Sequence, residues 1–181
     1  MSIPLQERAL RHGHTSKGLA SEVDVILGID PGPTESAFVL YGPATRNVCE
    51  FGKLANADLL ARLMEWNDRN WLIVLEMIAS YGMPVGREVF ETCMWIGRYI
   101  QAWNPGHELI YRSTVKLHLC GSMRAKDANV RQALIDAFGG KDKAIGTKRA
   151  PGALHGVSGD VWSALAVAVT YADIQEQARA A

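Results

Sequence analysis

The sequence has no net charge, few cysteines and no long apolar run, and each absence excludes a class of protein. Lysine plus arginine and aspartate plus glutamate both number 19 among 181 residues, so only a local cluster of charge can attract an acidic partner. The three cysteines, Cys49, Cys93 and Cys120, lack CxxC spacing, which favours reduced thiols over disulfides or a zinc site. The longest apolar run, Val161 to Ala172, is shorter than the roughly 20 residues that span a bilayer. We therefore expect a cytoplasmic protein without a membrane segment.

The length is that of one ordinary domain, preceded by a short polar segment. Residues 1–22 contain no apolar core of a secretory signal, so we interpret them as a flexible N-terminal arm. Residues 23–181 are expected to form a single domain that buries roughly two thirds of its unfolded surface.

Apolar periodicity predicts an α/β domain. Strands are predicted at Val25–Ile29, Ser36–Tyr41, Asn47–Leu54, Trp71–Met77 and His107–Arg112. Helices are predicted at Asn56–Trp66, Arg87–Trp103, Thr114–Leu119, from Lys126 or Asp127 to Phe138, and from Gly159 onward. Asn56 and Ser113 are the expected N-caps of their helices. The first three strands follow one another directly, which indicates an antiparallel meander.

Three carboxylates lie at the end of a strand, within a strand and at the start of a helix. Asp30 ends the first strand before a Pro-Gly turn, Glu76 lies within the apolar strand WLIVLEM, and Asp160 opens the last helix. Each also has a purely structural interpretation, because Asp favours turns and helix N-termini and Glu76 can face solvent at a strand end. Three carboxylates that converge near a core require a cation between them, and hard oxygen ligands favour Mg²⁺ or Mn²⁺.

Positive charge is concentrated between His107 and Pro151, where nine Lys or Arg face four acidic residues. This segment is either a solvated surface or a phosphate-binding face. Large apolar residues are also locally in excess. The predicted helix Arg87–Trp103 carries more of them than is typical of a helix with one solvent-exposed face. It is either buried within one subunit or in contact with a second subunit.

The element order and four motifs resemble the RNase H-like nuclease superfamily and, within it, the RuvC-type Holliday junction resolvases, including those encoded by phages. The motifs are GIDPG at residues 28–32, LE at 75–76, VKLHLCGSMRAKDANVRQAL at 115–134 and SALAVAVTYA at 163–172. The resemblance covers about Val25 to Ala172. It implies an RNase H-like fold, with a mixed five-stranded sheet in which parallel strands follow the antiparallel meander and helices flank both.

The resemblance also implies an activity, namely metal-dependent, structure-selective cleavage of four-way DNA junctions by a homodimer that uses no nucleotide cofactor. Two Mg²⁺ or Mn²⁺ ions per site are expected, with Asp30 bridging both and Glu76 and Asp160 each binding one. Lys116 and Lys126 correspond to the family's two functional lysines. The expected DNA contacts are Tyr81, which would stack on bases at the crossover, and Arg112, Lys116, Arg124, Lys126, Lys141, Lys143, Lys148 and Arg149.

The sequence departs from the family at the last helix. Ser163 stands where family members place a fourth acidic or histidine ligand, and serine is a poor ligand for a hard metal. Ser163 and the loop residue His155 are therefore both candidates for the fourth ligand.

Two other classes of protein are compatible with parts of this pattern. A non-catalytic protein that binds junctions would explain the loss of the fourth ligand. An actin-like or sugar-kinase ATPase also begins with a strand ending in Asp-x-Gly, but that fold needs a second domain and further phosphate loops, which the chain lacks.

Overall fold

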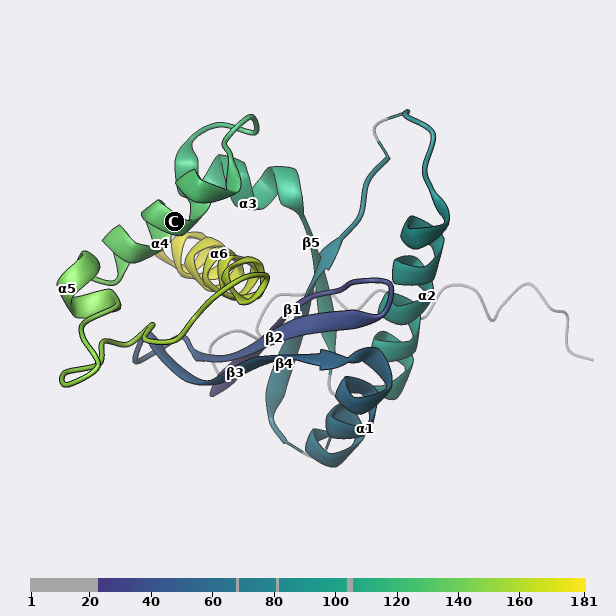
Figure 1. Ribbon diagram of the computed structural model, residues 1–181, viewed down its shortest axis with the longest axis horizontal. Helices are drawn as coiled ribbons and strands as arrows, with labels where there is room; N and C mark the ends of the chain where they lie inside the picture. The colour runs from purple at the N-terminus through teal and green to yellow at the C-terminus, as the bar shows by residue number, and fades with distance from the viewer. Residues whose placement is uncertain (1–22, 68, 81, 104–105) are drawn as a thin grey trace, which may run out of the picture.

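The computed structural model describes residues 23–67, 69–80, 82–103 and 106–181, which form a five-stranded sheet flanked by helices (Figure 1). The strands are β1 (Val25–Asp30), β2 (Glu35–Gly42), β3 (Asn47–Ala55), β4 (Trp71–Met77) and β5 (His107–Tyr111). The helices are α1 (Asn56–Trp66), α2 (Arg87–Ala102), α3 (Arg112–Cys120), α4 (Asp127–Ala137), α5 (Lys141–Ala144) and α6 (Val161–Ala180).

The order of strands across the sheet is β3-β2-β1-β4-β5. β2 pairs antiparallel with β1 and with β3, whereas β4 pairs parallel with β1 and with β5. The predicted antiparallel meander and the parallel strands implied by the resemblance are both confirmed. The parallel pairing follows from the crossovers, because α1 separates β3 from β4 and α2 separates β4 from β5.

The sheet carries an apolar core on each face, because successive side chains of a strand point to opposite faces. On β1, Ile26 packs toward α6, whereas Leu27 and Ile29 pack into the cluster formed with α1 and α2. Figure 1 shows α1 and α2 on one side of the sheet and α3, α4 and α6 on the other.

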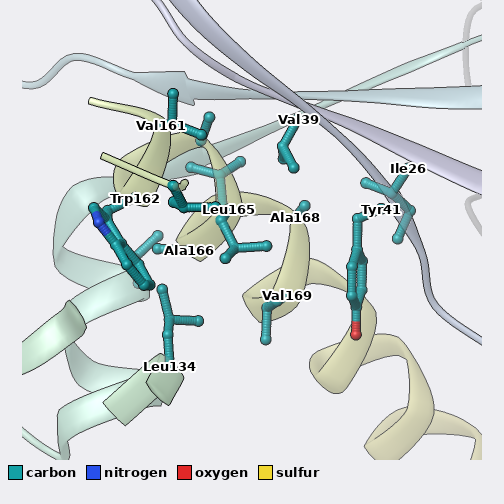
Figure 2. Packing of buried hydrophobic residues seen from close by; sticks show 14 of the residues in the cluster. Ile26, Val39, Tyr41, Leu134, Val161, Trp162, Leu165, Ala166, Ala168 and Val169 are labelled. Carbon is teal, nitrogen blue, oxygen red and sulfur yellow. The ribbon is translucent and has the colours of Figure 1, made fainter. Parts of the chain in front are cut away.

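Helix α6 contains the longest apolar run in the sequence. The run is apolar all round because the sheet covers one side of the helix and α4 covers another. Ten residues between Val161 and Tyr171 are buried. In Figure 2, Val39 lies on the sheet side of α6, and Leu134 of α4 approaches it from the opposite side. A helix covered on two sides needs no polar stripe along its buried turns.

Gly28 lets α6 approach β1 very closely. A Cβ added at Gly28 would lie 2.4 Å from the carbonyl oxygen of Ala164 and 2.9 Å from Cβ of Ala168. The absence of a side chain at Gly28 therefore lets the backbone of the first turns of α6 lie directly against β1.

Two predicted helix caps are wrong. Helix α1 has Ala55 as its N-cap, and the side chain of Asn56 instead hydrogen bonds to the carbonyl oxygen of Gly32. Helix α3 begins at Arg112 with Tyr111 as its N-cap, so the chain passes from β5 into the helix before Ser113. The role of Asn56 was decided by a hydrogen-bond partner distant in the sequence and not by the local preference of asparagine for helix caps.

The short helix α5 was not predicted. The predicted arm at residues 1–22 and the predicted stacking residue Tyr81 lie outside the described residues. Within the described ranges, no helix is long and apolar enough to cross a membrane. Cys49, Cys93 and Cys120 are all free thiols, as expected.

Candidate active site

The sheet register places the two strand carboxylates side by side. Ile29 of β1 pairs with Leu75 of β4 in the last pair of the parallel ladder, so the next residues, Asp30 and Glu76, lie side by side just beyond its end. Both continue the alternation that directs Ile26 toward α6, so both carboxylates lie on the α6 face of the sheet. The proximity expected of Asp30 and Glu76 thus has a direct cause in strand pairing.

The same cross-strand row continues to a lysine that sequence reasoning missed. Asp30 pairs with Ala37 of β2, and Ala37 pairs with Lys53 of β3. Paired side chains share a face, so Lys53 lies on the α6 face two strands, or about 10 Å, from Asp30. The register of the predicted meander was the signal that could have identified it.

Lys53 binds the third carboxylate. Its Nζ lies 2.9 Å from Oδ2 of Asp160 and 3.5 Å from Oε2 of Glu35. The hydrogen bond to Asp160 raises the pKa of Lys53. Asp160 immediately precedes α6, so the close packing of α6 on β1 is what brings this carboxylate to the sheet.

Asp30 is affected by both of the other carboxylates, and its negative charge is unfavourable in this position. Burial, then the charges of Glu76 and Asp160, raise the pKa of Asp30 to about 7, although Arg112 and a hydrogen bond from Ser163 act in the opposite direction. A carboxyl that stays protonated up to neutral pH lacks an adequate counter-charge. Such a site favours a proton or an added cation.

Arg112 neutralises Glu76. Its Nη1 lies 2.9 Å from Oε2 of Glu76, and its Nη2 lies 2.7 Å from Oδ1 of Asp127. Burial raises the pKa of Glu76, whereas Arg112 lowers it. Glu76 therefore has the partner cation that a carboxylate within an apolar strand requires.

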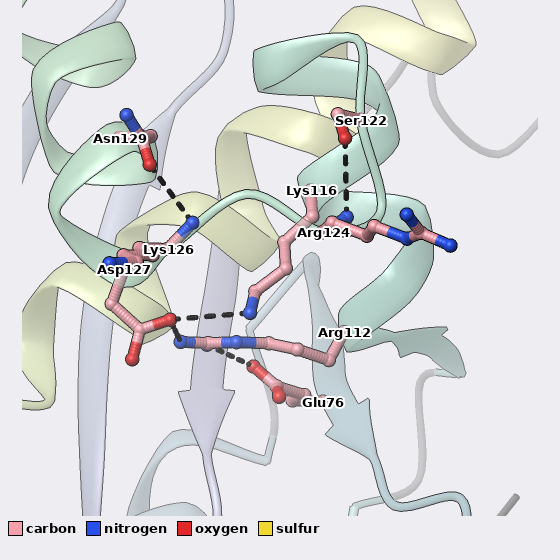
Figure 3. A network of polar contacts seen from close by, with 8 residues as sticks. All are labelled: Glu76, Arg112, Lys116, Ser122, Arg124, Lys126, Asp127 and Asn129. Carbon is pink, nitrogen blue, oxygen red and sulfur yellow. Dashed lines mark hydrogen bonds and ion pairs between the residues drawn. The ribbon is translucent and has the colours of Figure 1, made fainter.

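Asp127 forms ion pairs with two cations beside the carboxylates, as Figure 3 shows. Besides Arg112, it binds Lys116, whose Nζ lies 3.6 Å from its Oδ1. The hydrogen bond from Arg112 lowers the pKa of Asp127. Arg112 and Lys116, both predicted DNA contacts, thus lie beside the carboxylates and are held by ion pairs.

The two candidates for a fourth ligand differ in position. Ser163 hydrogen bonds to Asp30, so its hydroxyl faces the carboxylate group. His155 is exposed, and its Nδ1 lies 3.0 Å from the carbonyl oxygen of Ile145. The close approach of α6 to β1 therefore favours Ser163 as the residue nearest to the site.

The remaining basic residues among the predicted DNA contacts form two groups. Arg124 and Lys126 are exposed on the segment between α3 and α4, and the backbone of Lys126 is fixed by Oδ1 of Asn129 at 2.9 Å. Further along the chain, Lys141, Lys143, Lys148 and Arg149 are exposed on α5 and the loop after it. The 11 residues of α4 separate the groups by about 16 Å at 1.5 Å per residue.

The carboxylates fit a hard divalent metal ion in their chemistry, because they offer oxygen donors with surplus negative charge around Asp30. Within the described ranges, no group of three or more His, Cys, Asp or Glu residues is arranged to hold a metal ion as the side chains stand. Glu76 and Asp160 are instead paired with Arg112 and Lys53.

The predicted RNase H-like fold is confirmed: the structure is a mixed five-stranded sheet with helices on both faces. It is similar to the structure of RuvC from Thermus thermophilus, with a TM-score of 0.61 and 18% sequence identity over 85% of this chain and 96% of that chain. T. thermophilus RuvC in complex with a Holliday junction substrate is also similar, with a TM-score of 0.58, 17% identity, and 84% and 95% coverage. No family model and no curated protein matches the chain.

Proposed function

We propose that this protein is a metal-dependent, structure-selective DNA endonuclease of the phage-like RuvC type, which resolves four-way junctions as a homodimer. The observation that supports this most strongly is the convergence of Asp30, Glu76 and Asp160 beside Arg112 and Lys116, on a fold similar to that of RuvC. The similar T. thermophilus protein has been seen with a Holliday junction substrate.

In this proposal Asp30, Glu76 and Asp160 would hold two Mg²⁺ or Mn²⁺ ions, and Asp30 would be the ligand common to both. When bound, the ions would supply positive charge at the phosphodiester and lower the pKa of the attacking water. Lys116 and Lys126 would bind the phosphates flanking the scissile bond, and Lys53 and Arg112 neutralise Asp160 and Glu76 in the absence of metal. The half-buried setting of Asp30 strengthens each of these interactions.

Cleavage of a synthetic four-way junction in Mg²⁺ or Mn²⁺ tests the proposal. We expect two symmetrically placed nicks, which depend on divalent metal and leave linear duplex intact. Binding without cleavage would instead identify an architectural junction-binding protein, and nucleotide hydrolysis would identify an ATPase.

Junction binding is expected to depend steeply on salt. If the basic segment neutralises about six phosphates, log K should fall with log salt at a slope near −5, at about −0.9 per contact. Lys116→Ala and Lys126→Ala should each reduce this slope by about one unit and slow cleavage more than binding. Fluorescence anisotropy between 50 and 300 mM salt, roughly the range in which such slopes develop, measures it.

Arg69→Ala is the matched control for the salt measurement, because Arg69 is an exposed cation at the opposite end of β4 from Glu76. It should leave the slope unchanged. An affinity independent of salt, or equal slopes for all the variants, would move the DNA-binding surface elsewhere.

The start of α6 is expected to contribute one charged ligand. Ser163→Ala should cost far less activity than Asp160→Asn, because only Asp160 brings a charge. Ser163→Asp should lower the Mg²⁺ concentration for half-maximal nicking, because it adds a carboxylate beside Asp30. Mg²⁺ titrations of cleavage by the single variants measure both effects.

His155→Ala separates the competing assignment. If His155 supplies the fourth ligand, this variant should be nearly as inactive as Asp160→Asn. A pH profile alone does not decide the question, because protonation of Asp30, whose pKa burial raises, would also weaken metal binding at acidic pH. Near-wild-type titrations for both Ser163→Ala and His155→Ala would mean that three carboxylates and solvent complete the site.

A further inference from the structure

A polar cluster is buried in the apolar layer between the sheet and helices α1 and α2. Ser36 of β2, Asn56 of α1 and Tyr99 of α2 are each at most 1% exposed. The hydroxyls of Ser36 and Tyr99 donate to Oδ1 of Asn56 at 2.7 and 2.9 Å, and the two hydroxyl oxygens lie 3.1 Å apart. Three elements distant in the sequence thus meet at one side-chain amide.

The cluster holds the turn that follows Asp30. The backbone N–H of Gly32 donates to Oγ of Ser36 at 3.3 Å, and its carbonyl oxygen accepts from Nδ2 of Asn56 at 2.9 Å. The backbone N–H of Asn56 also donates to the carbonyl oxygen of Thr34 at 2.9 Å. Gly32 is therefore held at both of its backbone groups, two residues beyond Asp30.

Apart from this turn, few contacts hold the backbone at Asp30. The parallel ladder from β1 to β4 ends at Ile29, so beyond that residue the backbone is fixed by the pairing of Asp30 with Ala37 and by the turn. A Cβ added at Gly32 would lie 2.4 Å from the carbonyl oxygen of Glu35, so the turn is also sterically tight.

Tyr41 provides an internal comparison for Tyr99. Both side chains are fully buried, yet the hydroxyl of Tyr41 has no hydrogen-bond partner among the described residues. The core thus accommodates a tyrosine with an unpaired hydroxyl, whereas the Tyr99 hydroxyl is directed at the amide that holds Gly32. Burial raises the pKa of Tyr99 to about 12, so this hydroxyl remains a donor near neutral pH.

We propose that Ser36, Asn56 and Tyr99 are positioning residues for Asp30: they fix the turn at residues 31–34 and, through it, the orientation of the Asp30 carboxylate. The inference rests on the proposed function, in which Asp30 holds divalent metal. It adds helix α2, through Tyr99, to the elements that determine the geometry of the site. Displacements of about 1 Å in a reacting geometry can cost 10²-fold in rate, so a few buried hydrogen bonds have a measurable effect.

Ser36→Ala and Tyr99→Phe test the proposal, with Tyr41→Phe as the matched control. Ser36→Ala leaves the N–H of Gly32 without its acceptor, and should raise the dissociation constant for Mn²⁺ and lower kcat about tenfold at unchanged KM for the junction. Tyr99→Phe keeps both bonds to Gly32 and removes one donor to Asn56, so about threefold effects are expected. Tyr41→Phe should behave like the wild type, because it removes a hydroxyl without a partner.

Three measurements separate positioning from general stability: Mn²⁺ binding by electron paramagnetic resonance, the melting temperature, and amide hydrogen exchange of peptides covering residues 30–35. Faster exchange of the turn in Ser36→Ala but not in Tyr41→Phe, with Mn²⁺ affinity restored by Ser36→Thr, would support the proposal. A lower melting temperature with wild-type Mn²⁺ affinity and kcat in Ser36→Ala would overturn it.

Failure of the proposed function is recognised separately. If the wild type neither binds Mn²⁺ nor nicks a junction, the proposed function is wrong. Faster exchange of the turn, confined to Ser36→Ala and Tyr99→Phe, would then still support the positioning of Asp30.

Discussion

Replacing Asp30 with asparagine is expected to lower junction nicking by about 10³-fold or more, while junction affinity stays within about threefold of the wild type. Asp30 is partly buried, and it is the carboxylate whose ionisation the charges of Glu76 and Asp160 oppose. Its neutral substitute would lose the shared metal ligand without altering the basic residues. Single-turnover nicking and anisotropy on the same junction measure the two quantities.

The same variant should be more stable without metal above neutral pH. Because the pKa of Asp30 is raised from 3.8 to about 7, the folded state binds more protons than the unfolded state between these values, so its stability falls as pH rises through this range. Asp30→Asn removes that penalty, which is at most about 4 kcal/mol at 1.36 kcal/mol per pKa unit. Its melting temperature in EDTA should exceed that of the wild type at pH 8 and match it near pH 4.

Asp142→Asn, at an exposed carboxylate of α5, is the control for both measurements and should change neither. Glu76→Gln and Asp160→Asn should also remove nicking, and double variants should lose little more than single ones, because deleting one ligand disturbs both ions. Full activity in any of the three single variants would remove that residue from the site.

Met94→Glu is expected to convert the protein into a monomer and to uncouple the two nicks. Met94 and Phe90 of α2 are 54% and 65% exposed. Met94 and Met64 of α1 line a shallow groove between the two helices. A junction with two-fold symmetry calls for two sites related by a dyad, which an isologous contact through this apolar surface would provide. A buried unpaired carboxylate there should weaken the dimer more than about 100-fold.

Light scattering at micromolar concentration measures the mass, and a cruciform plasmid distinguishes paired from single nicks. Leu117→Glu, at an exposed apolar residue of α3, is the control for the mass. A wild type that is monomeric and still makes paired nicks would contradict the homodimer.

The sequence by itself determined the five strands, every helix except the short α5, and their order. The apolar runs of β1 and β4 and the helical spacing of α1 and α2 are local patterns, and a strand or helix responds to its local pattern. The same runs made Asp30 and Glu76 conspicuous, because a charge inside or at the tip of a buried strand needs a reason. The antiparallel meander could be predicted too, since short connections leave few alternatives.

Only the tertiary structure decided what surrounds these carboxylates. The row that joins Glu76, Asp30 and Lys53 depends on the register of three strand pairs, and a shift of one residue would turn each side chain to the other face. Arg112 reaches Glu76 because a parallel crossover brings β5 beside β4, and nothing within residues 107–112 encodes that neighbour. Asn56 looked like a helix cap because its local context suits one; its buried bonds to Ser36 and Gly32 formed because the chain folded back on itself.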